Sequence, residues 1–149
     1  GGMAIRFNES DVRSMGRTAA GVRAIKLDKK DFVVGLVAVK RAGTSILVVT
    51  DKGYGKRSDL QDYRMTRRGG KGVITMKSSD KNGSVISIRE VVDNDDLMII
   101  TTKGIMIRQN LGEIRVMGRN TQGVRLIKLH EGDTISAVAS VVGDDDEVE

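Results

Sequence analysis

The chain has 149 residues, of which 25 are Lys or Arg and 20 are Asp or Glu, and it contains one His and no Cys, Pro or Trp. This length fits about one domain. The lack of Cys excludes a disulfide framework, and a single His excludes the usual zinc sites. No apolar run approaches the roughly 20 residues that cross a bilayer, and the N-terminus lacks a signal-peptide pattern. We therefore expect a cytoplasmic protein without a membrane partner.

A repeat organises the chain from its N-terminal end. Met3–Phe7 is the first strand-like stretch, and because it aligns with 105–109 we expect it to be the last strand of a preceding unit. RSMGR at 13–17 returns as RMTRR at 64–68 and RVMGR at 115–119, in steps of 51 positions (13, 64 and 115). A fixed period of this length predicts stacked or radially arranged supersecondary units.

The middle unit indicates what each repeat contains. Short β-branched segments occupy 73–77, 84–90, 97–101 and 105–108, and turn signals separate them at 80–83, 93–96 and 102–104. Val and Ile number 31 against 8 Leu, a composition that favours strands. We therefore predict an all-β, propeller-like fold. Each unit is expected to form a four-stranded antiparallel sheet, a blade, that borrows or lends a strand at its ends.

The predicted domain spans 1–143, with units at about 13–63, 64–114 and 115–142. Residues 144–149 form an acidic tail with five carboxylates, expected to be disordered and either to compete for basic surface or to aid solubility. Without the tail, 25 bases face 15 acids (20 − 5), which favours a polyanionic partner. Open β edges at both ends predict self-association of this chain.

The most basic segment is the loop 64–72. Its cations are Arg64, Arg67, Arg68 and Lys71, and its glycines are Gly69, Gly70 and Gly72. Glycines let the backbone approach a phosphate, and arginines bind phosphate oxygens in pairs. The alternative is a solvated turn with surface charges. A P-loop is excluded, because no GxxxxGK[ST] spacing exists.

Further cations recur at similar positions in the other units. They are Arg13, Arg17, Arg23, Lys26, Lys77, Arg115, Arg119, Arg125 and Lys128. Lys56 and Arg57 form a second basic pair, expected on the same rim or on an exposed hairpin strand. Such a pattern predicts a curved basic rim for duplex DNA, bound through phosphates with little base readout. Aromatic residues for stacking unpaired bases are scarce, which argues against single strands and RNA.

No catalytic or metal site is predicted. His130 stands alone, so a nucleophile–base pair cannot be assembled, and it is interpreted as a turn residue. Asp93, Asp95 and Asp96 lack the EF-hand spacing and are interpreted as a polar turn. Tyr54 and Tyr63 are interpreted as packing residues.

At these loops the sequence resembles the C-terminal domain of DNA gyrase A subunits over residues 3–142. TRRGGKG at 66–72 is similar to the family's box, Gln-Arg-Arg-Gly-Gly-Lys-Gly, with Thr66 in place of Gln. The stretches 12–27, 53–57 and 114–129 are similar to the family's repeats. The family's principal box lies in its first blade, whereas this loop lies in the second of three units.

The resemblance implies a β-pinwheel of six blades, of which this chain resembles the last three, that wraps double-stranded DNA around its rim. It implies no catalysis and no cofactor in this chain. The holoenzyme would be an ATP- and Mg²⁺-dependent type II topoisomerase that introduces negative supercoils. Its partners would be the rest of the gyrase A protein and the gyrase B protein, near the bacterial nucleoid. The alternatives are the equivalent domain of the topoisomerase IV A protein, or a basic β-scaffold that binds RNA or an acidic protein.

Overall fold

The computed structural model describes residues 1–142, so the acidic tail predicted for 144–149 lies outside the described residues. Its strands are β1 (Met3–Ala4), β2 (Arg6–Phe7), β3 (Ser45–Thr50), β4 (Tyr54–Asp59), β5 (Met65–Thr66), β6 (Val73–Ile74), β7 (Val85–Val91), β8 (Asp96–Thr101), β9 (Met106–Asn110), β10 (Val124–Arg125) and β11 (Ile135–Val141). Three single-turn 3-10 helices join them: η1 (Glu9–Asp11), η2 (Leu60–Asp62) and η3 (Leu111–Glu113). Within residues 1–142, no helix is long and apolar enough to cross a membrane.

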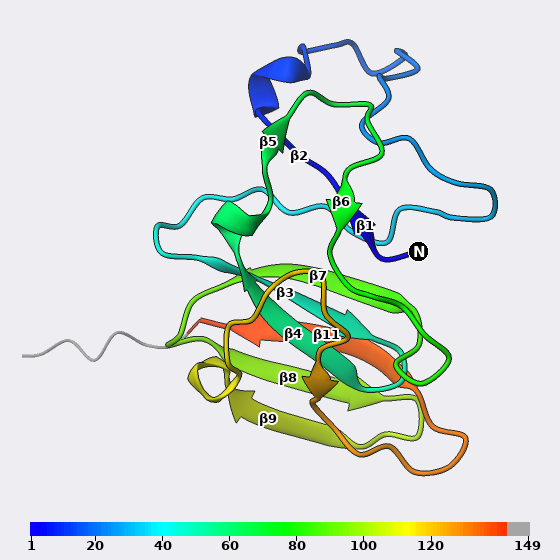
Figure 1. The fold of residues 1–149 in the computed structure, drawn as a ribbon, viewed down its shortest axis with the longest axis vertical. Coiled ribbons are helices and arrows are strands. Elements are labelled where there is room, and N and C mark those ends of the chain that lie inside the picture. Colours follow the sequence, from blue (N-terminus) through cyan, green and yellow to red (C-terminus); the bar gives the residue numbers. More distant parts are fainter. Residues whose placement is uncertain (143–149) are drawn as a thin grey trace, which may run out of the picture.

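The strands form two larger sheets and two small ones. One sheet has the order β10-β4-β3-β7, and the next has the order β11-β8-β9. Both are antiparallel, whereas β1 pairs with β6 and β2 pairs in parallel with β5 in two-stranded sheets. Figure 1 shows the larger sheets in the lower half of the view and the small ones above them. The predicted all-β, propeller-like architecture is confirmed.

The predicted exchange of strands between units is confirmed, and it extends beyond the ends of a unit. In the middle unit, β6 pairs with β1, β7 pairs with β3, and only β8 and β9 form a hairpin together. Each sheet therefore takes its strands from successive repeats. The apolar pattern locates strands but does not specify their partners. Strand β3 pairs with β4 of its own unit on one edge and with β7 of the next unit on the other.

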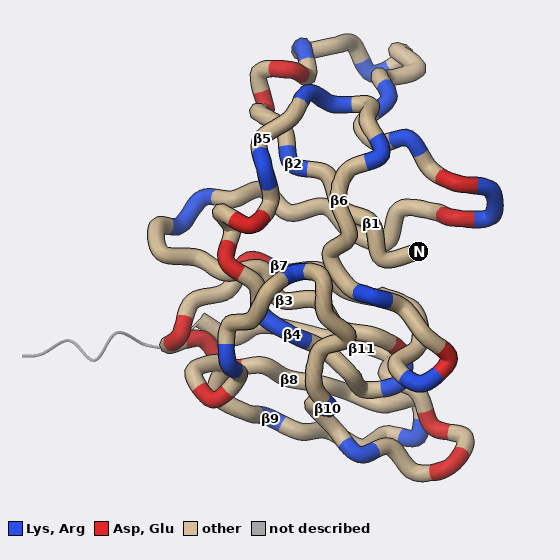
Figure 2. Tube along the Cα trace, viewed as in Figure 1, with Lys and Arg blue, Asp and Glu red and all other residues tan. Residues whose placement is uncertain are grey.

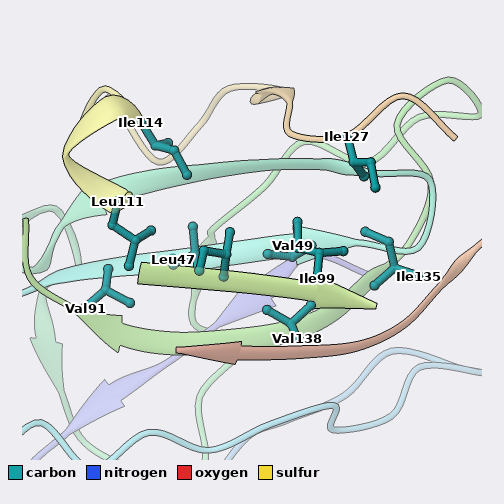
Figure 3. Close-up of a cluster of buried hydrophobic side chains, with 10 residues drawn as sticks. Leu47, Val49, Val91, Ile99, Leu111, Ile114, Ile127, Ile135 and Val138 are labelled. Carbon is teal, nitrogen blue, oxygen red and sulfur yellow. The ribbon is translucent and has the colours of Figure 1, made fainter. Parts of the chain in front are cut away.

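Strand β3 is buried along its whole length and separates two hydrophobic clusters. Leu47 and Val49 point into a cluster with Ile99 of β8 (Figure 3), and Leu97 of β8 belongs to the same cluster. Ile46 and Val48, on the other face, pack with Tyr63 and Met76. Alternate side chains of a strand point to opposite faces, so a strand covered on both sides reads as a continuous apolar run.

The repeat is also visible in local geometry. Asn8, Asp59 and Asn110, each 51 positions apart, precede the three 3-10 helices. Each side chain accepts a hydrogen bond from the backbone N–H two residues on, at 3.0, 2.8 and 2.8 Å. A side-chain oxygen that caps the first turn in this way fixes where the chain leaves the strand. Equivalent strands thus end in the same turn in all three units.

The two chain ends lie in strands with one partner each. β1 and β2 pair with β6 and β5, and β11 pairs with β8 along its length. Because β11 is the outermost strand of the order β11-β8-β9 and the sheets of β1 and β2 have two strands each, these strands keep one open edge in the described chain, as predicted. A further exposed apolar segment is 32–39, which belongs to no strand of the described chain. Phe32 is 72% exposed and Leu36 is 84% exposed. Segment 32–39 lies 51 positions before the region of β7 and is its equivalent in the repeat. β7 pairs with β3, but no described strand pairs with segment 32–39.

Candidate nucleic-acid interface

The glycine-rich loop 66–72 lies on the first unit, not on its own. The backbone N–H of Gly69 donates to the carbonyl of Ala24 at 2.6 Å, and the N–H of Lys26 donates to the carbonyl of Gly70 at 2.8 Å. Thr66 in β5 pairs beside Phe7 of β2. Figure 1 shows this loop beside the chain that follows η1. The loop and segment 23–26 are therefore held together, and both carry cations.

Gly72, at the end of this loop, is required by packing. Its φ is +77°, and a Cβ atom would lie 2.1 Å from the carbonyl oxygen of Ala4. Gly123, 51 positions later, has φ +75° and would place a Cβ 2.6 Å from the carbonyl oxygen of Gly55. In contrast, a Cβ at Gly70 would meet its nearest atom at 3.6 Å. The glycines thus have different roles: Gly72 allows close backbone contact, and Gly70 leaves an open, exposed stretch of backbone.

The basic edge is defined here as the edge strands β6 and β10 together with the loops that precede them, 64–72 and 115–123. β10 is an edge strand of the four-stranded sheet, and β6 takes the same position beside β1. At the opposite edge, residues 34–36, 86–89 and 135–138 line a groove of about 460 Å³. Figure 2 shows Lys and Arg on the loops before β6 and β10. The cationic loops and this groove therefore lie at opposite edges.

Most of the predicted cations are exposed. These are Arg13, Arg17, Arg23, Lys26, Arg64, Arg67, Lys71, Lys77, Arg115, Arg125 and Lys128. In residues 1–142 the side chains of Arg67 and Lys71 make no hydrogen bond or ion pair, so their charges are available to a ligand. Arg23 lies between the half-buried Val22 and Ala24, whereas Val124 is exposed beside Arg125 in the equivalent strand β10.

Arg68 and Arg119 are half-buried and bind backbone. Arg68 donates through Nε to the carbonyl of Asp11 at 3.0 Å and through Nη1 to that of Arg23 at 3.1 Å. Arg119 donates in the same way to the carbonyls of Asp62 at 3.0 Å and Ile74 at 2.8 Å. Both were predicted to contact the ligand, and both guanidinium groups are also used within the fold.

Lys56 does not lie on the basic edge, so its predicted exposure is wrong. Its side chain is fully buried, and its ammonium group donates to the carbonyls of Gly118, Arg119 and Thr121. Burial is the main cause that lowers the pKa of Lys56 to about 8, the charge of Arg119 contributes to the lowering, and Asp62 opposes it. Through the three carbonyls the ammonium group holds the 115–123 loop on β4.

Arg57 is likewise buried, at 3% exposure, and the prediction that it lies on the rim is wrong. It donates through Nη1 to the carbonyls of Leu111 at 2.7 Å and Ile114 at 3.3 Å, and it pairs with Asp93 at 2.6 Å. Arg6, which the sequence analysis missed, donates to the carbonyls of Leu60 and Tyr63 in the same way. Arg6 lies 51 positions before Arg57 in the sequence, and this spacing could have identified the two arginines as equivalent residues of the repeat.

The residues interpreted as structural behave accordingly. Asp93, Asp95 and Asp96 pair with Arg57, Arg41 and Arg108, respectively. The hydrogen bond from Arg108 is the main cause that holds the pKa of Asp96 below its usual value. Tyr63 is buried, with its hydroxyl 2.5 Å from that of Thr75, and Tyr54 packs against the same cluster. His130 is exposed in a turn. Among residues 1–142, no cluster of His, Cys, Asp or Glu is suited to a metal ion.

Fold and site together define a propeller-like repeat protein that exchanges strands between blades and carries cationic loops at one edge. The chain belongs to the family described as the DNA gyrase C-terminal domain, beta-propeller, whose sequence model matches residues 1–40, 44–91 and 95–141.

Curated relatives and solved structures agree with this assignment. The DNA gyrase A protein of Staphylococcus epidermidis is 47% identical over 95% of this chain, and that of Ureaplasma parvum is 46% identical over 93%. This chain spans 16% of the length of each. A solved gyrase A C-terminal domain superposes with a TM-score of 0.87 at 29% identity, covering 95% of this chain and 48% of that one. The C-terminal domain of a DNA topoisomerase IV gives 0.88 at 27% identity, with 97% and 45% covered.

Proposed function

We propose that this chain binds double-stranded DNA along its basic edge and bends the duplex around it. The observation that carries the proposal is the recurrence of exposed cations on the loops before the equivalent strands β6 and β10. Such a row of charges matches a regularly spaced phosphate backbone, and curvature lets successive blades contact the same duplex. Arg67 and Lys71 would contact phosphates in the glycine-rich loop, where their charges are exposed and free of partners within residues 1–142.

Duplex DNA is favoured over single strands, RNA or an acidic protein. The chain has only two Tyr and two Phe, and the two tyrosines are engaged in packing, so there is little surface on which unpaired bases could stack. Competition binding with duplex DNA, single-stranded DNA, RNA and a polyglutamate peptide tests this choice. We expect duplex DNA to displace the others, and preferential binding of any of them would support the alternative.

Binding is expected to depend steeply on salt and weakly on base sequence, because phosphate contacts release counterions. If on the order of five phosphates are contacted, the slope of log affinity against log salt will be about −4 to −5. Fluorescence anisotropy with two unrelated duplexes over a salt series measures both properties. A flat salt dependence would contradict the proposal, as would a strong preference for one of the two sequences.

For the longer protein we propose a role as part of a DNA gyrase, an ATP- and Mg²⁺-dependent type II topoisomerase of the bacterial cytoplasm. This chain would supply DNA binding without a cofactor of its own, and the gyrase B protein and the rest of the gyrase A protein would supply the chemistry. The curated gyrase relatives and the RRGGKG sequence of the loop support gyrase over topoisomerase IV. The similar TM-scores for the two solved domains do not separate them.

The isolated 149-residue chain is expected to self-associate through segment 32–39. Exposed apolar backbone without a strand partner pairs readily with another chain. Light scattering across a concentration series should show a mass above the 16.2 kDa of one chain. A Leu36→Lys variant should reduce this association, because a charge on an edge opposes pairing. A constant monomer mass at high concentration would contradict the prediction.

A further inference from the structure

We propose that Arg68 is a positioning residue that holds three cation-bearing segments in one arrangement, whereas Arg67 supplies charge to the ligand. This inference rests on the proposed binding of duplex DNA. The inference assigns different roles to two adjacent arginines that look equivalent in the sequence.

The contacts of Arg68 join parts of the chain that are distant in sequence. Its Nε reaches the carbonyl of Asp11, just before Arg13, and its Nη1 reaches the carbonyl of Arg23 itself. The backbone bonds of Gly69 and Gly70 to 24–26 continue the same attachment. One guanidinium group therefore fixes the loop 64–72 against two other segments of the chain that carry exposed cations.

The same arrangement recurs one unit later. Arg119 lies 51 positions after Arg68, and its partners Asp62 and Ile74 lie 51 positions after Asp11 and Arg23. Two occurrences with the same atoms indicate that an arginine at this position belongs to the repeat.

Unlike Arg68, Arg67 is not a recurring residue of the repeat. The equivalent residues in the other units are Gly16 and Gly118, so the fold does not require a side chain here. Arg67 is exposed and makes no hydrogen bond or ion pair among residues 1–142. It therefore adds a charge to a loop whose position Arg68 sets.

The chemistry of the two side chains gives a charge-conserving test. A lysine at 67 keeps a point charge that can bind phosphate. A lysine at 68 keeps the charge but places its donors on a single nitrogen, so it does not reproduce the spacing and fixed plane by which Nε and Nη1 reach two different segments. Loss of affinity in Arg68→Lys would therefore arise from a misplaced loop and not from a lost charge.

The experiment compares Arg67→Lys, Arg68→Lys and Arg119→Lys in the 149-residue chain, with Arg67→Ala as the charge-removal reference. Two quantities are measured: affinity for a duplex over a salt series, and amide hydrogen exchange of Gly69 and Lys26 without DNA. We expect Arg68→Lys to bind about tenfold more weakly, and exchange at both amides to be about tenfold faster. Arg67→Lys should bind within about threefold of the parent. Arg119→Lys should leave the exchange rates of these two amides unchanged, because Arg119 holds loop 115–123 and not loop 64–72.

The outcomes separate the two proposals. Unchanged exchange in Arg68→Lys would overturn the positioning role whether or not DNA binds. Equal affinity losses in Arg67→Lys and Arg68→Lys would also overturn it. Failure of the parent chain to bind any duplex would overturn the proposed function, and the exchange measurement would then decide the positioning role alone. Arg67→Ala should reduce the magnitude of the salt slope by about 1, and no reduction would contradict the assignment of Arg67 to the ligand.

Discussion

An Arg57→Ala variant is expected to lose about 3 to 4 kcal/mol of unfolding free energy, because buried polar groups lose their donor. Arg57 joins β4 to η3 of the next unit through the carbonyls of Leu111 and Ile114. Its Nε also donates to the hydroxyl of Ser45 at 2.9 Å. Alanine would leave these acceptors without their partner and open a cavity between two sheets. Since domains of this size are marginally stable, the variant should unfold at clearly lower urea concentration.

The chain offers a matched control in Arg108, which occupies the equivalent position one repeat later. Arg108 is 60% exposed and pairs with Asp96 at the surface. Arg108→Ala should cost no more than about 1 kcal/mol, as expected for an exposed ion pair. Urea unfolding followed by circular dichroism compares the two. Equal losses would show that the buried contacts of Arg57 do not stabilise the joint between the sheets.

The double variant Arg67→Ala, Lys71→Ala is expected to weaken duplex binding by about tenfold or more at moderate salt, because it removes two charge-assisted phosphate contacts. Neither side chain has a partner among residues 1–142, so stability should change by less than about 0.5 kcal/mol per site. Electrophoretic shift at fixed salt measures the affinity, and the unfolding midpoint checks the fold.

The control for this variant removes the same net charge elsewhere. Lys40 and Lys103 are exposed and belong to neither the loops nor the strands of the basic edge. Lys40→Ala, Lys103→Ala should lower affinity by no more than about twofold, through long-range electrostatics alone. If both double variants weakened binding equally, net charge and not the glycine-rich loop would account for the affinity.

Periodicity predicted the fold class well, because 51-residue spacing and alternating apolar residues are local properties of the chain. Strand partners were not predictable in the same way. β7 pairs with β3, about 40 positions upstream, and nothing within either segment specifies that choice. The glycine-rich loop similarly packs on the preceding unit, a contact that depends on the whole array.

The candidate site was predictable where charge and exposure coincide. Arg67 and Lys71 are exposed, as a glycine-rich turn predicts. Lys56 and Arg57 were misjudged, because lysine and arginine are rarely buried without partners, and the partners here are carbonyls of a loop and a 3-10 turn more than 50 residues away. The contacts of Arg68 were not predictable for the same reason, because its carbonyl acceptors, on Asp11 and Arg23, are distant in the sequence.

The most direct test of the central claim is the topology of a relaxed DNA circle that is nicked, incubated with the 149-residue chain and closed by ligase. A duplex that curves around successive blades in one hand traps writhe, so the account predicts that the linking number shifts in one direction as protein is added. The Arg67→Ala, Lys71→Ala variant should reduce this shift at the same protein concentration. An unchanged linking number, at a concentration where the circle is fully bound, would show that the basic edge holds DNA without wrapping it.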